Sequence, residues 1–454
     1  MRTAARAALA VAVLAAAAGG VAVGMSARDE PTVRRPVPVA AAPTTEPTRS
    51  PLLPSRRDSP LPTPAGLAAA LTTALADPAL GPSVSAVVLD ATTGASLLDL
   101  RGSTPVVPAS TAKIATGVAV LAGLPPETRL RTQALAGPLP GDVVLVGGGD
   151  VTLAGPATPP ATGPPGARLT DLAAQTRTAL GATPVQRVLV DDTAYAPPAT
   201  GPSWKPSYLV TDVAPVQALS MDGGRAAPGR DERVADPALA TGRAFARLLA
   251  APAAAVVRAP APAGAALLGA VDSAPLPDLV EQMLTASDND LAESLGHRLA
   301  LARGLPGTFA GAAQATRDVL ADLVPAGGVT LADASGLSVE NRVQPAAVAA
   351  LLATVAGDRS GRYGAVLSGL PVAGFDGTLE ARYRAGATVP AAGQVRAKTG
   401  TLLGVSALAG LVRTADGRLL AFDVTLNAVP SGATRAAEAA LDRVATVLAG
   451  CGCR

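Results

Sequence analysis

The sequence predicts an α/β fold in which an antiparallel sheet flanked by helices is interrupted by an inserted, β-rich domain. Alternating apolar runs at residues 83–100 and 394–427 have the period of β-strands, whereas the segments at 263–393 have mostly helical spacing. Strands at both ends of a chain with helices between them are typical of one sheet-containing domain. The texture changes at 129–262, where short strand-like runs, many Pro and Gly and the single Trp occur. This change indicates the inserted domain.

The composition of the chain limits the classes of protein to consider. The chain has 454 residues, of which 49% are hydrophobic and 2% aromatic, so two or three domains with cores of Ala, Val and Leu are expected. The formal net charge is +2, and a near-neutral chain gives no electrostatic reason to expect a nucleic-acid partner. One histidine and two cysteines are too few for a multi-histidine metal site or a disulfide framework. We therefore expect no metal and no nucleic acid.

The first 64 residues have the features of a targeting segment followed by a spacer. Residues 1–27 contain two arginines and then no charged residue, which is typical of a signal peptide. The uncharged length also approaches that of a membrane span, so a retained membrane anchor is the alternative. Residues 28–64 are rich in Pro, Thr, Ser and Arg, which predicts a disordered linker. Either interpretation places the bulk of the protein outside the cytoplasmic membrane, secreted or anchored to the outer face of that membrane.

The remaining elements follow from periodicity. A helix is expected over 65–77, a hairpin over 83–100, another helix over 111–124 and a last helix over 432–450. The terminal Cys-Gly-Cys-Arg is expected to be a frayed tail, with a local or an intermolecular disulfide as the alternative. The predicted order is a first part of the sheet domain, the insertion, a second part and the tail, at residues 65–128, 129–262, 263–450 and 451–454.

Lysine is rare in this chain, so its positions are informative. The cations are arginines except at Lys113, Lys205 and Lys398. Ser110 stands at the start of the helix expected in PASTAKIATG, and Lys113 lies three residues later. Residues at i and i+3 share a helix face, about 5–6 Å apart at their Cβ atoms. A serine hydroxyl needs a base to become a nucleophile, and lysine can be that base when its pKa is lowered, whereas arginine cannot. The alternative is a capping serine beside a surface lysine.

Two further segments are ambiguous in the same way. The Ser-Asp-Asn at residues 287–289 precedes a helical pattern, and these three residue types are also preferred helix caps. The Lys-Thr-Gly at residues 398–400 lies in a strand-like run. A glycine in a strand often marks the close approach of another backbone, as when a substrate adds to a sheet edge. Lys205 is interpreted as a surface residue or a residue of the insertion.

The ordered set S-x-x-K, S-D-N and K-T-G is more specific than any one of its members, because it is typical of β-lactamases and penicillin-binding proteins. Over residues 65–450 the chain resembles the D-alanyl-D-alanine carboxypeptidase/endopeptidases among the low-molecular-mass class C penicillin-binding proteins. The segments LVGGGDVTL, LADASGLSVENRV and LPVAGFDGTLEAR are similar to segments of that family. The resemblance implies a β-lactamase/transpeptidase-like catalytic domain with an extra domain between the first two motifs. The short interval before the second motif predicts one inserted domain, and no cofactor is implied.

The resemblance also implies roles for residues. Ser110 would form the acyl-enzyme and Lys113 would be its base. Ser287 would pass a proton to the leaving amine, and Asn289 would hold the substrate amide or orient Lys113. Lys398 would add a positive charge that favours neutral Lys113 and attracts the substrate carboxylate.

Substrate binding is implied for residues Thr399, Gly400 and Thr401. Thr399 would bind the carboxylate, and the backbone N–H groups of Ser110 and Thr401 would form the oxyanion hole. Structural roles near the site are expected for Asp333, Ser335 and Asn341.

The function implied is a serine D-Ala-D-Ala carboxypeptidase, with DD-endopeptidase action as a second activity. It would trim peptidoglycan stem peptides and be acylated by β-lactam antibiotics as covalent inhibitors. A β-lactamase shares the motifs and is one alternative, and a non-catalytic peptidoglycan-binding homologue is another. A Ser-His-Asp hydrolase would need His297 as its base, and His297 is expected on a solvated helix.

Overall fold

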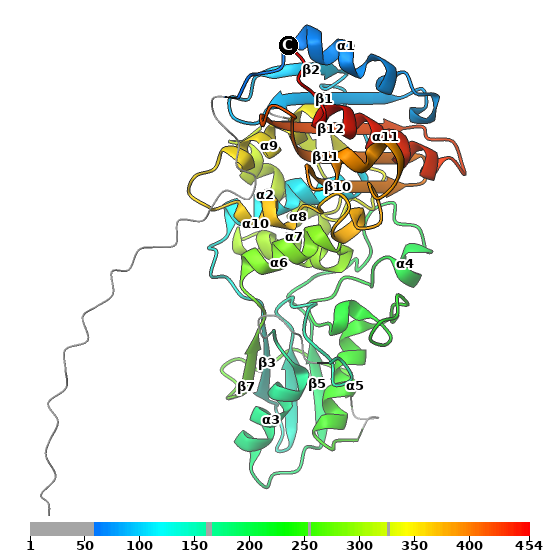
Figure 1. Ribbon diagram of the computed structural model, residues 1–454. Coiled ribbons are helices and arrows are strands. Elements are labelled where there is room, and N and C mark those ends of the chain that lie inside the picture. The colour runs from blue at the N-terminus through cyan, green and yellow to red at the C-terminus, as the bar shows by residue number, and fades with distance from the viewer. Residues whose placement is uncertain (1–58, 160–165, 253–255, 325–326) are drawn as a thin grey trace, which may run out of the picture. The chain divides into compact units, whose positions relative to one another are not determined.

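The computed structural model describes residues 59–454 except 160–165, 253–255 and 325–326 (Figure 1). The predicted leader at residues 1–27 and nearly all of the linker lie outside the described residues and stay predictions. No helix in the described ranges combines the length and the apolar character needed to cross a membrane.

The main sheet is antiparallel and has five strands in the order β10-β11-β12-β1-β2. Its strands are β1 (Val84–Asp90), β2 (Ser96–Leu100), β10 (Val395–Leu402), β11 (Val405–Arg413) and β12 (Leu419–Asn427). The predicted N-terminal hairpin joins the C-terminal strands because β1 pairs with β12 along its whole length. This mixed α/β fold with an antiparallel sheet is the class predicted from the sequence, which is confirmed.

Helices cover both faces of this sheet (Figure 1). One face carries Phe422 and other alternate residues of the strands, and it packs against α1 and α11. The opposite face carries Ala409 and Ala421, and it packs against a group of helices that surrounds α2. The alternation follows from the two-residue period of a strand, which sends successive side chains to opposite faces. The helices of this domain are α1 (Pro64–Leu75), α2 (Ala112–Gly123), α6 (Leu276–Thr285), α7 (Asn289–Ala302), α8 (Phe309–Leu320), α9 (Pro345–Gly357), α10 (Gly364–Gly369) and α11 (Thr434–Ala449).

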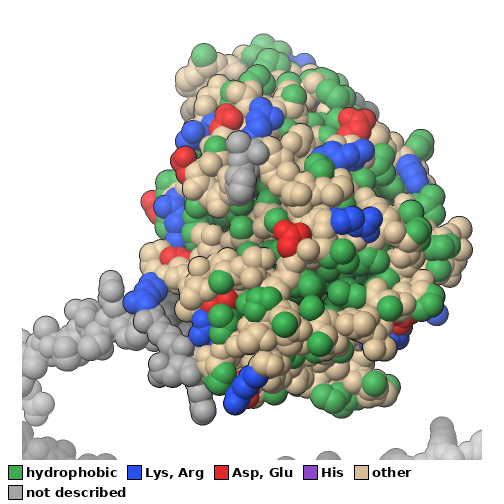
Figure 2. Space-filling view, turned by 90° about the horizontal axis from the view of Figure 1, so that it is seen from above, with side chains coloured by type: hydrophobic (Ala, Val, Ile, Leu, Met, Phe, Trp, Pro, Cys, Tyr) green, Lys and Arg blue, Asp and Glu red, His purple; other side chains and the backbone are tan. Residues whose placement is uncertain are grey.

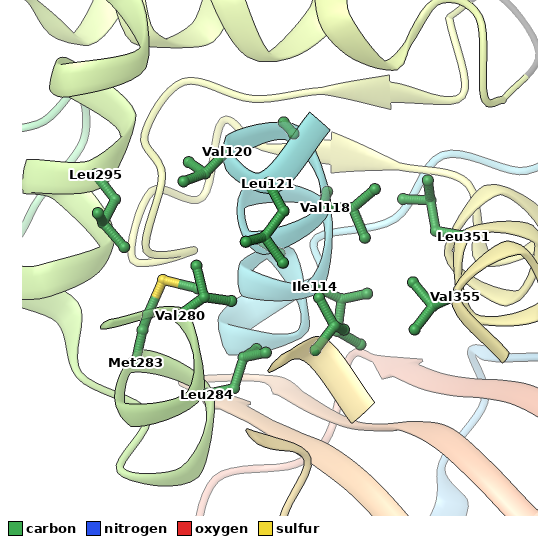
Figure 3. Close-up of a cluster of buried hydrophobic side chains, with 14 of the residues drawn as sticks. Ile114, Val118, Val120, Leu121, Val280, Met283, Leu284, Leu295, Leu351 and Val355 are labelled. Carbon is green, nitrogen blue, oxygen red and sulfur yellow. The ribbon is translucent and has the colours of Figure 1, made fainter. Parts of the chain in front are cut away.

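Helix α2 is buried on all sides. Every residue from Ala112 to Leu121 is buried, and the helix lies among Val280 and Met283 of α6, Leu295 of α7 and other apolar side chains (Figure 3). A helix that is apolar all round is typical of a core position. The residues at the start of α2 are therefore fixed by packing.

The insertion forms a second, mixed sheet in the order β6-β5-β4-β3-β7. Its strands are β3 (Arg131–Ala136), β4 (Asp142–Val146), β5 (Arg187–Asp191), β6 (Val256–Arg258) and β7 (Leu267–Asp272). The helices α3 (Leu169–Leu180) and α5 (Pro237–Leu248) share a hydrophobic cluster with it. The predicted boundary at residue 262 is too early for this sheet, because β7 pairs antiparallel with β3. Shorter elements are α4 (Tyr208–Thr211), β8 (Val329–Thr330) and β9 (Arg342–Val343).

The C-terminal tail is ordered, so the expected fraying is wrong. Cys451 and Cys453 form a disulfide with each other, which is the local bridge considered as an alternative. The backbone N–H of Thr63, at the N-terminus of α1, donates to the carbonyl oxygen of Cys453 at 2.8 Å. This hydrogen bond fixes the tail next to the start of α1. It is a long-range contact that the sequence does not reveal.

The outer surface seen from above carries charges of both signs. Lys and Arg are interspersed with Asp and Glu on that face (Figure 2). This distribution agrees with a net charge of +2.

The buried face of the main sheet predicts a large effect of a single truncation. Phe422 is 0% exposed between the sheet and the helices α1 and α11, whereas Phe375 is 66% exposed. We expect Phe422→Ala to lower the free energy of unfolding by about 3–5 kcal/mol, because it leaves a cavity. The control Phe375→Ala should stay within about 0.5 kcal/mol of wild type. Urea unfolding followed by circular dichroism measures both, and equal effects would contradict the assigned packing.

Candidate active site

Ser110 and Lys113 lie together at the start of α2. A 3₁₀ turn at Ala109–Thr111 leads directly into the helix. The Nζ atom of Lys113 lies 3.2 Å from the Oγ atom of Ser110, as the i, i+3 spacing predicts. Lys113 is 0% exposed, whereas Ser110 is partly exposed. Ser110 is therefore accessible from solvent, whereas the amine next to it is not.

The turn that carries Ser110 is held between two glycines. A Cβ atom on Gly400 would lie 2.7 Å from the carbonyl oxygen of Pro108, and one on Gly336 would overlap the carbonyl of Ala109. Ala109 itself has a φ of 50°, in the left-handed region that non-glycine residues rarely occupy. Such strain persists where the surroundings fix the backbone. The glycine of the K-T-G segment is thus explained by the chain's own backbone, whereas the sequence suggested a substrate.

In the Ser-Asp-Asn segment, Asp288 caps a helix and Asn289 contacts Lys113. Asp288 caps α7, because its carboxylate accepts the N–H of Leu291 at 2.9 Å. Asn289 is left to accept from the Nζ atom of Lys113 through Oδ1 at 2.6 Å, while its Nδ2 atom donates to the carbonyl oxygen of Asp212 at 2.9 Å. These two bonds fix the orientation of the amide.

Ser287 is part of the same turn, with a φ of 56°. Its backbone N–H donates to the carbonyl oxygen of Leu284 at 3.3 Å. The hydrogen bonds of the described residues connect Ser110, Lys113 and Asn289, and none joins the Ser287 hydroxyl to them. Ser287 lies near Asn289 because the two are separated by one residue in the sequence.

The K-T-G segment lies on β10, which is an edge strand of the main sheet. The N–H of Ala397 donates outward, to the carbonyl oxygen of Pro371 at 2.9 Å. Because a strand repeats every two residues, the N–H groups of Thr399 and Thr401 also face away from β11. The hydroxyl of Thr399 donates to the hydroxyl of Thr378 at 2.8 Å. This part of the edge presents donors suited to an extended substrate.

Lys398 is fully buried on the opposite side of the strand from these threonines. It is 0% exposed, and its Nζ atom donates to the carbonyl oxygen of Thr399 at 3.0 Å. Burial and the nearby Lys113 ammonium hold the pKa of Lys398 well below its usual range. The resemblance implied a standing positive charge on Lys398, and these surroundings oppose that charge.

Burial also lowers the pKa of Lys113, to about 8. The carboxylate of Asp333 acts in the opposite direction, because a negative charge stabilises the ammonium. The resting ammonium has three acceptors, Ser110 Oγ, Asn289 Oδ1 and the carbonyl oxygen of Ser335 at 2.7 Å. An amine with this pKa loses its proton far more readily than an exposed lysine, so it can serve as a base near neutral pH.

The loop that supplies the Ser335 carbonyl is held by two buried carboxylates. Asp333 accepts the N–H of Gly336 at 2.8 Å and the Nδ2 of Asn341 at 2.8 Å. Glu293 accepts the N–H of Ser335 at 2.8 Å, and burial raises the pKa of Glu293 to about 8. The expectation that Asp333, Ser335 and Asn341 act structurally near the site agrees with these contacts.

Segments of the insertion complete the surroundings of the site. The indole N–H of Trp204 donates to Asp333 Oδ2 at 2.7 Å. Arg233 pairs with Asp290, the residue after Asn289, at 3.0 Å, and both side chains are buried. The insertion is therefore linked to the second motif and to the Ser335 loop.

His297 is buried, so the expectation of a solvated helix is wrong. Its ring packs against Tyr195 and Phe309, with centroid distances of 4.8 and 5.0 Å. Burial lowers the pKa of His297 to about 4, and its Nδ1 atom is hydrogen-bonded to the carbonyl of Glu293. The helix α7 is buried on this side because α8 packs against it, and His297 is a core residue.

Two contributors to the site are absent from the motifs. Glu293 lies one helical turn after Asn289, and this i, i+4 spacing is the signal that could have found it. Thr378 contacts Thr399 from a distant loop, and no local pattern indicates it.

The fold and this arrangement are those of a serine peptidase. The chain belongs to the D-Ala-D-Ala carboxypeptidase 3 (S13) family, whose model matches residues 67–232 and 229–448. It is a serine-type D-Ala-D-Ala carboxypeptidase, as the sequence predicted. This family acts on peptidoglycan, so the role of the protein is extracytoplasmic.

Similar proteins cover nearly the whole chain. Carboxypeptidase Rv3627c of Mycobacterium tuberculosis is 38% identical over 93% of this chain and 91% of its own length. Carboxypeptidase DacB of Mycolicibacterium smegmatis is 40% identical over 88% of each chain. The crystal structure of penicillin binding protein 4 from Haemophilus influenzae matches with a TM-score of 0.67 and 22% identity, over 83% of this chain and 97% of that one. This match supports the fold.

The prediction that Lys113 is the base implies a specific loss of activity on substitution. Lys113→Arg keeps the positive charge, but guanidinium cannot accept a proton. We expect release of D-Ala from a peptide ending in D-Ala-D-Ala to fall by about 100-fold to 10,000-fold. The control is Lys205→Arg, since the Lys205 ammonium lies 5.9 Å from the centroid of the Tyr208 ring and no hydrogen bond of the described residues joins it to Ser110 or Lys113. Near-wild-type activity of Lys113→Arg would exclude Lys113 as the base.

The same base predicts the pH dependence of the reaction. Because burial lowers the pKa of Lys113 to about 8, the neutral amine becomes more abundant as the pH rises through that value. Below it, kcat/KM for D-Ala release should fall about tenfold per pH unit. Rates measured from about pH 6 to about pH 10 test this expectation. A flat profile across that range would show that deprotonation of Lys113 does not limit the reaction.

Proposed function

We propose that the protein removes the terminal D-Ala from peptidoglycan stem peptides through an acyl-enzyme on Ser110. The observation that carries this proposal is the contact of the Lys113 amine with the Ser110 hydroxyl at 3.2 Å and with the Asn289 amide at 2.6 Å. A partly exposed hydroxyl next to a buried amine of lowered pKa is the arrangement that nucleophilic catalysis requires. DD-endopeptidase action on cross-linked peptides is a second activity of the same site.

The acylation step begins with transfer of the Ser110 proton to neutral Lys113. The Oγ atom then forms a bond with the carbonyl carbon of the penultimate D-Ala. The tetrahedral oxyanion is stabilised by the N–H groups of Ser110 and Thr401, and such a donor is typically worth about 3 kcal/mol. The outward direction of the Thr401 N–H on the open edge of β10 supports this assignment.

Breakdown of this intermediate releases D-Ala. The peptide C–N bond breaks, and the leaving nitrogen takes a proton that Ser287 passes on from Lys113. Water then attacks the ester carbonyl with Lys113 again as base. The products are the shortened peptide, free D-Ala and regenerated Ser110.

The substrate carboxylate is bound by Thr399 and Lys398 in this proposal. Thr399 is partly exposed, and the Nζ atom of the buried Lys398 donates to the carbonyl oxygen of Thr399 at 3.0 Å. Burial depresses the pKa of Lys398, and an arriving carboxylate supplies the opposite charge that stabilises its ammonium. Gly400 lets the Ser110 turn approach β10, as its contact with Pro108 indicates.

Penicillin and other β-lactams acylate Ser110 in the same way and act as covalent inhibitors. Rapid hydrolysis of penicillin, which a β-lactamase requires, is the alternative, and a non-catalytic peptidoglycan-binding role is a second. The fit of the S13 family model along the chain favours the peptidase. Attachment to the outer face of the membrane through residues 1–27, or secretion after their cleavage, completes the proposal.

The proposal is tested by mass spectrometry of the protein after incubation with penicillin. Ser110→Ala should remove the covalent adduct, which in wild type should map to the peptide containing Ser110. Thr111→Val is the control, because Thr111 is buried and its hydroxyl donates to the carbonyl of Pro108 at 2.8 Å. An adduct that persists in Ser110→Ala would place the nucleophile elsewhere. Hydrolysed penicillin accumulating without D-Ala release would favour the β-lactamase.

A further inference from the structure

A pocket in the insertion is lined by three arginines. It has a volume of about 230 Å³, and Arg225, Arg243 and Arg247 contribute to its walls together with small apolar residues such as Gly224 and Ala240. No acidic residue lines it. Three guanidinium groups from two separate segments around one small hollow favour the binding of an anion.

The position of Arg225 is fixed by its backbone. Its guanidinium donates to the carbonyl oxygen of Asp222 at 3.3 Å. A Cβ atom on Gly223 would lie 2.5 Å from the Nη1 atom of Arg225, and Gly223 has a φ of 62°. Only glycine suits both that conformation and that space. The absence of a side chain at Gly223 therefore leaves room for the Arg225 side chain to lie over this turn.

The other two arginines belong to one helix face. Arg243 and Arg247 are four residues apart on α5, so they lie one above the other and are both exposed. Two like charges at this spacing repel each other unless an anion lies between them. An ordinary explanation exists for Arg247 alone, because a cation in the last turn is favoured by the helix dipole. The helix dipole does not explain why Arg225 and Arg243 line the same pocket as Arg247.

The neighbouring carboxylates are engaged elsewhere. Asp222 accepts from Gly155 and Thr158, and Asp236 pairs with Arg258. Within the described part of the chain, none of the three arginines of the pocket forms an ion pair. Their charge is therefore available to a ligand.

The pocket is linked to the catalytic site by a short series of contacts. Arg225 forms an isolated β-bridge with Arg233. Arg233 pairs with Asp290 at 3.0 Å, and the adjacent Asn289 contacts Lys113. The pocket is therefore connected through Arg233 and Asp290 to the segment that carries Asn289.

We propose that this arginine pocket binds the free C-terminal carboxylate of a second, already trimmed peptide of the same polymer. The inference rests on the proposed function, because removal of D-Ala leaves a peptide that ends in a new carboxylate. A carboxylate matches the paired donors of a guanidinium, and the hollow admits one such end group. Through this pocket the enzyme would stay bound to peptidoglycan that it has already trimmed.

The test uses a fluorescent peptide ending in a free D-Ala carboxylate, and the same peptide ending in an amide. Anisotropy titrations are made with untreated protein and with protein whose active site has been treated with penicillin. The free acid should bind treated wild type, and the amide should bind much more weakly. The double variant Arg243→Gln/Arg247→Gln should lose about tenfold or more in affinity, as expected when charge-assisted hydrogen bonds are removed.

Arg317→Gln is the matched control. Arg317 is exposed in the last turn of α8, a helix of the same length as α5, and does not line the pocket. Arg317→Gln should bind the peptide like wild type, and all variants should keep wild-type D-Ala release at saturating substrate.

Equal binding of acid and amide, or unchanged affinity in the double variant, would overturn the proposal. Displacement by inorganic phosphate at lower concentration than by acetate would refute a carboxylate ligand. A missing penicillin adduct counts against the proposed function alone, since the comparison of variants is also made on untreated protein.

Discussion

The burial of one ammonium group governs the structure around the site. Removing Lys113 from water carries a large desolvation penalty, which is tolerable only when each donor finds an acceptor. The three acceptors come from segments far apart in the chain: Ser110 before α2, Asn289 at the start of α7 and the carbonyl of Ser335 in a loop. Glu293 and Asp333 then hold that loop in place. Much of the polar architecture therefore serves to keep one lysine buried and still able to lose its proton.

Close backbone packing is the second requirement, and small residues meet it. The turn at Ser110 lies against Gly336 and Gly400, where any side chain would collide with its backbone. Helix α2 presents Gly117 and alanines to its neighbours, so the helices around it approach closely. Such close approach suits a chain with only 2% aromatic residues, whose interior is filled mainly by small and aliphatic side chains. The same packing fixes the 3.2 Å contact between Lys113 and Ser110.

Local features of the sequence predicted most of the fold, and long-range contacts explain what it missed. The S-x-x-K distance follows from helix geometry, and the strands of the main sheet follow from alternation. The membership of β7 in the second sheet depends on its pairing with β3, which no local pattern encodes. His297 was misplaced because its partners Tyr195 and Phe309 come from other segments. Ser335 acts through its backbone carbonyl, and backbone groups carry no signature in a sequence.

The two buried lysines have different surroundings, and this difference bears on how the site is switched on. Lys113 has carboxylates nearby that favour its ammonium, whereas the pKa of Lys398 is depressed by burial and by Lys113. Before substrate binds, the proton shared by the pair is better placed on Lys113. In the proposed function, a substrate carboxylate next to Lys398 would reverse this preference, because it would stabilise the Lys398 ammonium and leave Lys113 facing a second positive charge. By linkage, the carboxylate that Thr399 and Lys398 are proposed to bind would also favour the neutral form of Lys113, the proposed base for the attacking Ser110 hydroxyl. Substrate binding and the activation of Ser110 would then be two effects of one charge, and we expect peptides that lack a terminal carboxylate to be poor substrates for an electrostatic reason.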